Sequence, residues 1–311
     1  MKLEEIQRIA VLGAGTMGPG IAQCYAMSGR EVCLYDISES ALVKARAMLL
    51  SNLDTFVDEE LLTVEEADAT YKRVSFTTVL AEALDGVQFV QETVAEKPQI
   101  KKSVFGEVDA ILPTEAILVS NASALNPFEL VPEGRRTNFA AAHWFAPPQI
   151  LPLVEVAKGE ETSEETMETI LALLRACGKK PVRLEKYVPG YIINRIQILL
   201  NTEVFYLLEN GVCTPEQMDM AVKASLMPRG MVLGLVQRYD FICSPKLRRW
   251  WTPSWMSWQR TSVWPPPMTC GTRCGRKSAA PILSSCRSVC RSPGRRSSRL
   301  CVTWSSARCS R

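Results

Sequence analysis

A glycine-rich turn near the N-terminus constrains the fold of this chain more than any other feature. The run Gly13-Ala14-Gly15-Thr16-Met17-Gly18 follows an apolar segment, residues 9–12, and opens a helical segment, residues 18–28. In a G-x-G-x-x-G turn the first glycine permits the tight bend, the second lets a pyrophosphate approach, and the third lets the helix pack against the strand. The helix N-terminus then offers free N–H groups to phosphates. The run predicts a strand–turn–helix unit that binds a dinucleotide through these residues.

An acidic residue after the second predicted strand indicates which dinucleotide binds. Asp36 closes the segment 31–35, about 20 residues beyond the glycine turn, where a carboxylate bonds the ribose 2′-hydroxyl. A carboxylate at this place repels a 2′-phosphate. The sequence therefore favours NAD over NADP.

Short apolar segments alternate with helical ones through most of the chain. The predicted strands are 9–12, 31–35, 74–76, 87–90, 117–120, 139–142, 153–156 and 181–184. This alternation predicts an α/β fold with a doubly wound parallel sheet of the Rossmann type. The character changes after Pro189-Gly190, where residues 191–208 read as an amphipathic helix and Thr214-Pro215-Glu216 begins another. We expect an NAD-binding domain over residues 1–187 and the start of an all-α substrate and dimerisation domain over residues 188–241.

Residues 242–311 differ from the rest of the chain in composition. They contain none of the 33 acidic residues but 14 of the 36 Lys and Arg residues, 7 of the 11 cysteines and 6 of the 7 tryptophans. A nucleic-acid-binding arm would be basic, but such arms rarely carry clustered tryptophans. A metal or disulfide module could use the pairs Cys270/Cys274 and Cys286/Cys290, although no histidine accompanies them.

The interpretation that we prefer for this tail is a shifted reading frame near residue 242. An out-of-frame GC-rich gene tends to encode Arg, Ser, Cys, Pro and Trp without acidic residues. The helical domain would then be truncated or altered, and the tail would be disordered. Sequencing the DNA across codons 235 to 245 tests this hypothesis, and an unbroken frame shared by an independent isolate would contradict it.

The cysteines and apolar runs of the first 241 residues indicate the cellular setting. Cys24, Cys33, Cys177 and Cys213 have no motif spacing, as is typical of a reducing compartment. The N-terminus carries no cationic segment followed by an apolar stretch, and no apolar run reaches the ~18 residues of a membrane span. We therefore expect a cytoplasmic protein with no membrane, nucleic-acid or metal partner.

The only histidine of the chain, His143, lies at the carboxyl end of the predicted strand 139–142. Ligands bind along this edge in open α/β sheets. Glu155 follows within the apolar strand 153–156, where a buried carboxylate needs a partner. A His–Glu pair would hold the imidazole in one tautomer and stabilise its protonated form. These two residues therefore predict a general base that accepts an alcohol proton near neutral pH.

Four ordered segments resemble the signature of the 3-hydroxyacyl-CoA dehydrogenases. They are residues 120–125 (SNASAL), 143–148 (HWFAPP), 153–156 (LVEV) and 189–195 (PGYIINR). The resemblance covers residues 6 to 241. It implies that His143 is the base, that Glu155 orients it, and that Ser123 and Asn194 contact the substrate oxygen at C3. It further implies that Glu96 and Lys101 touch the cofactor or its pocket, and that the protein is a homodimer unless the altered C-terminus prevents this.

Two departures from the family pattern leave the substrate open. Ala146 stands where the family usually has an asparagine beside the nicotinamide. The acidic run Asp58-Glu59-Glu60 lies where CoA phosphates would need cations. The first hypothesis is reversible NAD-dependent oxidation of a short-chain (S)-3-hydroxyacyl-CoA such as 3-hydroxybutyryl-CoA. The alternatives are a dehydrogenase of the same fold acting on a hydroxy acid without CoA, of the gulonate or carnitine type, and an NAD-binding protein inactivated by its tail.

Overall fold

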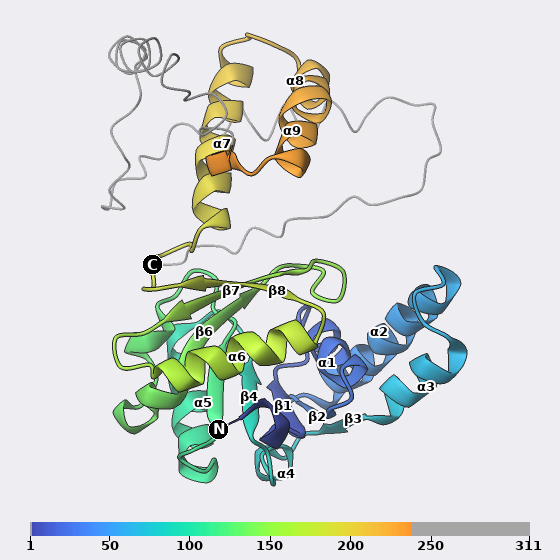
Figure 1. Cartoon of the computed structure of the whole chain (residues 1–311), viewed down its shortest axis with the longest axis vertical. Helices are drawn as coiled ribbons and strands as arrows, with labels where there is room; N and C mark the ends of the chain where they lie inside the picture. The colour runs from blue at the N-terminus through green and yellow to red at the C-terminus, as the bar shows by residue number, and fades with distance from the viewer. Residues whose placement is uncertain (1, 238–311) are drawn as a thin grey trace. The chain divides into compact units, whose positions relative to one another are not determined.

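The computed structural model describes residues 2–237 of the chain (Figure 1). Contacts divide the chain into two units, one ending at Met218 and the other beginning at Asp219. The first unit contains the sheet and also helix α7, Ile193–Glu209. The domain boundary near residue 188 stays a prediction. The predictions for the tail, residues 242–311, lie outside the described residues.

Within these residues one eight-stranded sheet forms, in the order β3-β2-β1-β4-β5-β6-β7-β8. Its strands are β1 Arg8–Leu12, β2 Glu31–Tyr35, β3 Val74–Thr77, β4 Phe89–Glu92, β5 Ile117–Ser120, β6 Phe139–Trp144, β7 Leu153–Lys158 and β8 Lys180–Leu184. The strand order reverses between β1 and β4, which is the crevice where a Rossmann-type sheet binds its ligand. The predicted fold class is confirmed.

The helices follow the strands much as the sequence indicates. They are α1 Gly18–Met27, α2 Glu39–Asp58, α3 Val64–Lys72, α4 Leu80–Ala83, α5 Pro98–Ile111, α6 Glu164–Ala176, α7 Ile193–Glu209, α8 Pro215–Ala221 and α9 Met227–Val232. Short 3-10 turns occur at Leu3–Glu5, Pro127–Glu129 and Glu133–Asn138, and a π-helical turn at Val222–Leu226 joins α8 to α9. No helix of residues 2–237 has the length and apolar character needed to cross a bilayer.

The prediction that all strands run parallel is wrong at one place. Strand β7 runs antiparallel to β6, and β8 is parallel to β7. A parallel return needs a crossover of roughly a dozen residues or more. The connection 145–152 is shorter than that, so the chain turns directly back. This turn places His143 opposite Glu155 in the ladder.

Two hydrophobic layers bury the sheet on both faces. Ile9 and Val11 of β1 pack with α1, α2 and α6, whereas Ala10 and Leu12 pack with α4 and α5. Successive side chains of a strand point to opposite faces, so an unbroken apolar run marks a strand covered on both sides. Helix α6 lies along β6, β7 and β8 (Figure 1). These layers fix the sheet edge at which the predicted site residues meet.

The glycine turn between β1 and α1 has the geometry that its sequence predicts. Gly13 has φ +107°, and a Cβ there would lie 2.7 Å from the Thr93 carbonyl oxygen. A Cβ on Gly18 would lie 2.0 Å from the Gly13 carbonyl oxygen and 3.4 Å from Leu34 of β2. A Cβ on Gly15 would meet no protein atom within 4 Å. Gly13 and Gly18 are therefore needed by the fold, while Gly15 leaves open space.

We predict that Gly18→Ala destabilises the protein and that Gly15→Ala does not. The Gly18 substitution forces backbone atoms apart and should lower the free energy of unfolding by about 2–3 kcal/mol. The Gly15 substitution should change it by less than about 0.5 kcal/mol. Urea unfolding of both variants without ligand measures the difference, and equal stabilities would contradict the role given to Gly18.

Candidate active site

His143 and Glu155 form a cross-strand pair at the carboxyl end of β6. The imidazole Nδ1 lies 3.1 Å from Glu155 Oε2, and the two side chains are buried. Both residues share a sheet face with Ala141 and Ala157, which belong to the small cluster around Tyr191. The antiparallel register and the two-residue period of strands bring together the two residues that the sequence singled out.

The Glu155 carboxylate also holds the start of α7. Its Oε1 accepts hydrogen bonds from the backbone N–H groups of Ile192 and Ile193, each at 3.0 Å. These donors leave Oε2 as the acceptor for His143, so Nδ1 carries the proton and Nε2 has a free lone pair. The arrangement provides an imidazole with a fixed tautomer and a buried counter-charge.

Two aromatic rings that the sequence reasoning missed enclose the imidazole. Tyr191 stacks on it with centroids 4.5 Å apart and planes 9° apart, and Phe145 meets it edge-on at 4.6 Å. Phe145 is close to His143 in sequence and could have been suspected. Tyr191 comes from the loop before α7, and only its place after Pro189-Gly190 hinted at a special turn.

Ser123 and Asn194 lie together at the exposed side of this site. The Asn194 amide Nδ2 donates to Ser123 Oγ at 3.3 Å, although 71 residues separate them in sequence. Two hydrogen bonds tie the loop of Ser123 to the residues around His143. The Trp144 N–H donates to Asn121 Oδ1 at 2.7 Å, and the Tyr191 hydroxyl donates to the Ala122 carbonyl at 2.7 Å. The geometry therefore brings a hydroxyl and an amide together beside the segments that hold His143.

Glu96 shapes the loop that carries Ser123. Its Oε1 accepts hydrogen bonds from the N–H groups of Ser123, Ala124 and Leu125 at 2.8–3.0 Å. Partial burial acts to raise the pKa of Glu96, but these three donors and Lys101 outweigh it, and the pKa is lowered. Glu96 is thus held as a carboxylate that fixes the backbone of the loop.

Lys101 is buried rather than open to a ligand. Its amine lies 2.7 Å from Glu92 Oε1 and 3.3 Å from Glu96 Oε2, and only 1 % of its side chain is exposed. The Ser120 hydroxyl donates to the other oxygen of Glu92. Burial raises the pKa of Glu92, against the opposing effect of Lys101 and Ser120. The Lys101 amine therefore contacts Glu92, Glu96 and the Val94 carbonyl oxygen.

The residues at the glycine turn fit a dinucleotide. Asp36 lies beside the turn, where its Oδ2 accepts the Ala14 N–H and its Oδ1 accepts the Ser38 N–H, both at 2.9 Å. Gly15 and Thr16 are exposed, and Met17 is half-buried at the start of α1. The empty space where a Gly15 Cβ would stand gives a ligand access to the backbone. This edge can accept the pyrophosphate and ribose of NAD.

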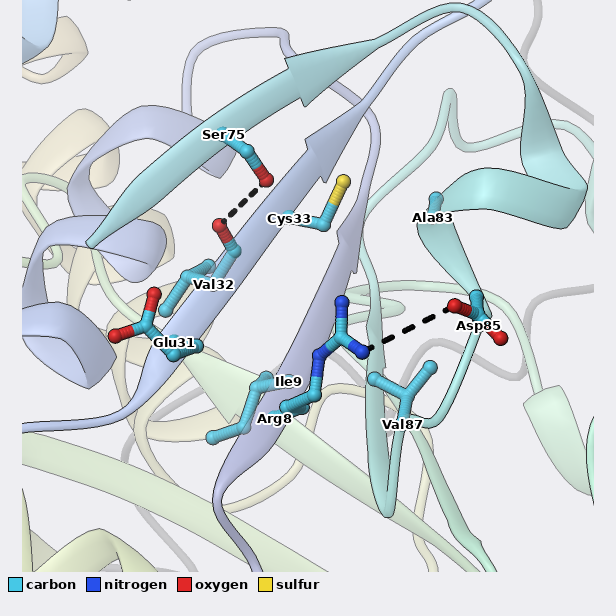
Figure 2. A pocket seen from close by; sticks show the side chains of 9 residues that line it. All are labelled: Arg8, Ile9, Glu31, Val32, Cys33, Ser75, Ala83, Asp85 and Val87. Carbon is cyan, nitrogen blue, oxygen red and sulfur yellow. Dashed lines mark hydrogen bonds and ion pairs between the residues drawn. The ribbon is translucent and has the colours of Figure 1, made fainter. Parts of the chain in front are cut away.

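The remaining candidate features lie apart from the His–Glu pair. Asp58, Glu59 and Glu60 are exposed where α2 ends. A hollow of about 210 Å³ lies at the amino ends of β1 and β2, whereas His143 lies at the carboxyl end of β6. Figure 2 shows the side chains that line this hollow. It contains none of the predicted site residues, and Arg8 and Asp85 on its wall lie 4.0 Å apart. Within residues 2–237 no group of three or more His, Cys, Asp or Glu residues could hold a metal ion.

We predict that Lys101→Met leaves Glu92 as an uncompensated buried charge. Such a loss costs about 3–5 kcal/mol in the free energy of unfolding. Burial raises the pKa of Glu92 in the folded protein above its value in the unfolded chain. Proton binding to Glu92 therefore stabilises the fold at pH values below the unfolded pKa. This stabilisation is lost as the pH rises through the folded pKa. The defect of the variant should therefore be larger at neutral than at acidic pH.

Urea unfolding at neutral and acidic pH measures this effect. Lys102→Met is the matched control, because Lys102 is the exposed neighbour of Lys101 on α5, and it should change stability by less than about 0.5 kcal/mol. The double variant Glu92→Leu with Lys101→Met should recover most of the loss. A Lys101→Met defect that does not depend on pH would contradict the buried-pair account.

Comparison with known proteins agrees with this geometry. Residues 8–187 match the NAD-binding domain of 3-hydroxyacyl-CoA dehydrogenases, and residues 190–243 match their C-terminal domain. A 3-hydroxybutyryl-CoA dehydrogenase of Clostridioides difficile is 33% identical over 217 residues, which are 70% of this chain and 76% of that protein.

A second kind of relative acts on a different compound. A 5-formyl-3-hydroxy-2-methylpyridine 4-carboxylate 5-dehydrogenase of Mesorhizobium japonicum is 35% identical over 240 residues, covering 76% of this chain and 75% of that protein. A crystal structure of an enzyme with this activity, described as an NAD+-dependent dismutase, superimposes with a TM-score of 0.73 at 29% identity, covering 92% of this chain and 87% of the other. The chain belongs to the 3-hydroxyacyl-CoA dehydrogenase family and is an NAD-dependent oxidoreductase acting on CH–OH groups.

Proposed function

We propose that this enzyme oxidises a short-chain (S)-3-hydroxyacyl-CoA, such as 3-hydroxybutyryl-CoA, to the 3-ketoacyl-CoA and catalyses the reverse reduction. The observation that carries the proposal is the buried His143–Glu155 pair, with Nδ1 and Oε2 3.1 Å apart, beside Ser123 and Asn194. This combination supplies a base and two polar groups for an oxygen. It is what abstraction of an alcohol proton requires.

The residues have distinct tasks in the proposed mechanism. NAD held at the glycine turn would supply the acceptor for the hydride that leaves C3 of the substrate. His143 takes the hydroxyl proton on Nε2. The Glu155 carboxylate accepts the hydrogen bond from Nδ1–H and stabilises the imidazolium. Ser123 and Asn194 hold the C3 oxygen as the alcohol becomes a ketone. In the reverse direction His143 returns the proton to the forming alkoxide.

The cofactor-binding roles complete this proposal. Gly13, Gly15, Thr16, Met17 and Gly18 would receive the pyrophosphate, and Asp36 would bond the ribose. Glu96 would lie beside the cofactor while holding the loop of Ser123, with Lys101 fixing Glu96. The expected homodimer is supported by exposed apolar residues of α7, among them Ile198, Leu199, Phe205 and Tyr206. The free thiols of Cys24, Cys33, Cys177 and Cys213 support a reducing, cytoplasmic setting.

A substrate without CoA is the second candidate. The Mesorhizobium relative acts on a small pyridine carboxylate, and this chain is 35% identical to it. The exposed residues Asp58, Glu59 and Glu60 would repel CoA phosphates if the substrate passed over them. The same base could serve a hydroxy acid or the hydrate of an aldehyde, since both present a hydroxyl on the carbon that loses hydride.

We predict that His143→Ala lowers kcat by about 10²- to 10⁴-fold, the usual contribution of a general base, and leaves NADH binding intact. NADH oxidation with acetoacetyl-CoA, followed by absorbance, measures turnover, and NADH fluorescence measures binding. Gly15→Ala is the control with the opposite expected effect on the cofactor: it should weaken NADH binding without unfolding the protein.

Each outcome of this experiment has a meaning. Turnover of acetoacetyl-CoA that survives His143→Ala would overturn the assigned base. Turnover of the native chain only with an aromatic aldehyde or a free hydroxy acid would favour the second candidate. NADH binding without turnover of any of these substrates would support the third hypothesis, an NAD-binding protein that its tail inactivates.

A further inference from the structure

The ring of Tyr191 is placed to act on the charge of His143. The two rings are nearly parallel, with planes 9° and centroids 4.5 Å apart, so the electron-rich face of the phenol covers the imidazole. An aromatic face attracts a cation most strongly where water is excluded. Tyr191 is fully buried and His143 is 5 % exposed. The stack therefore places the aromatic face against the ring that would carry the positive charge.

The backbone holds this ring at a conformational cost. Tyr191 has φ +50°, in the left-handed region that non-glycine residues seldom adopt, and it follows Gly190 at φ +79°. Strain of this kind persists only where the surroundings fix it, and it is concentrated at functional sites. Here the next two N–H groups bind Glu155. The turn thus places both the Tyr191 ring and the start of α7 in contact with the His143–Glu155 pair.

The hydroxyl of Tyr191 reaches the other side of the site. It donates to the Ala122 carbonyl at 2.7 Å, one residue before Ser123. Burial raises the pKa of Tyr191 well above its ordinary value, and the nearby acidic groups raise it further, so the phenol keeps its proton and remains a donor. One side chain therefore touches both the base and the loop that carries Ser123.

We propose that Tyr191 is a positioning residue of the dehydrogenation, whose ring stabilises protonated His143 and whose hydroxyl fixes the loop of Ser123. The inference rests on the proposed role of His143 as the base. The ionisable groups around this stack are Glu155 on β7, Glu92 at the end of β4, Glu96 between β4 and α5, Lys101 on α5, and Tyr187 after β8. Among them, Glu155 bonds the imidazole directly.

His143 is the only histidine in the chain, which makes the ring effect directly measurable. The imidazole NMR signals of the full-length, tag-free protein titrate as a single group, without any need for turnover. Tyr191→Leu keeps an apolar side chain but removes the aromatic face. We expect the midpoint of the titration to fall by about one pH unit, the size of a desolvated cation–π contact.

Two variants separate the ring from the hydroxyl. Tyr191→Phe keeps the stack, so the midpoint should stay near that of the native protein, while loss of the bond to Ala122 should raise KM for the acyl substrate by up to about tenfold. Tyr187→Phe is the matched control. Tyr187 donates to the Leu125 carbonyl of the same loop at 3.1 Å, and its ring meets that of Tyr191 edge-on, with centroids 5.5 Å apart. Its loss should leave the midpoint unchanged.

The outcomes distinguish this proposal from the proposed function. An unchanged midpoint in folded Tyr191→Leu overturns the role of the ring, whatever the enzyme turns over. A lowered midpoint in a protein that turns over no acyl-CoA supports the ring effect and contradicts only the substrate. If Tyr191→Leu does not fold, a ring-fluorinated phenylalanine at position 191 tests the same effect. It keeps the shape and weakens the negative face, so its midpoint must lie below that of Tyr191→Phe, and equal midpoints would overturn the proposal.

Discussion

The carboxylate of Glu155 is the group on which the arrangement of the site depends. A buried charge is stable only with a full set of partners. Glu155 is 1 % exposed, and it obtains these partners from two segments at once, the imidazole of His143 and the first N–H groups of α7. If α7 began elsewhere, the carboxylate would lack donors. The position of the His143 imidazole and the start of α7 are therefore set by one side chain.

A second carboxylate organises the substrate side by the same principle. Glu96 collects three consecutive N–H groups of the loop around Ser123 and is held in turn by the buried amine of Lys101. Backbone donors fixed in this way cannot easily reorient, so the loop presents Ser123 in one direction. The 3.3 Å contact between Ser123 and Asn194 is a consequence of both carboxylates, since each places one of the two segments.

The sequence predicted the parts of this site that depend on local chemistry. The glycine turn and Asp36 follow from spacing, and the His–Glu pair follows from a carboxylate in an apolar strand that needs a partner. The turn of β7 was misassigned because strand–helix alternation was extended across a connection too short for a crossover. Helix α2 extends to Asp58 because Leu53 and Phe56 are still buried and continue its apolar face. Tyr191 and the burial of Lys101 depend on contacts between distant segments, which one sequence does not reveal.

The chemistry of the site and the recognition of its substrate make different demands on the fold. The proposed oxidation of a secondary alcohol needs a base, groups that hold one oxygen, and a face for the cofactor, and the residues proposed for these tasks lie at the carboxyl edge of one sheet. In the proposed function, the CoA or carboxylate group of the substrate would be bound by residues farther from the reacting carbon. Substitutions there change the substrate without disturbing Glu155 or Glu96, each of which is constrained by burial or by several hydrogen bonds. This separation accounts for relatives of about equal identity that act on an acyl-CoA and on a pyridine carboxylate.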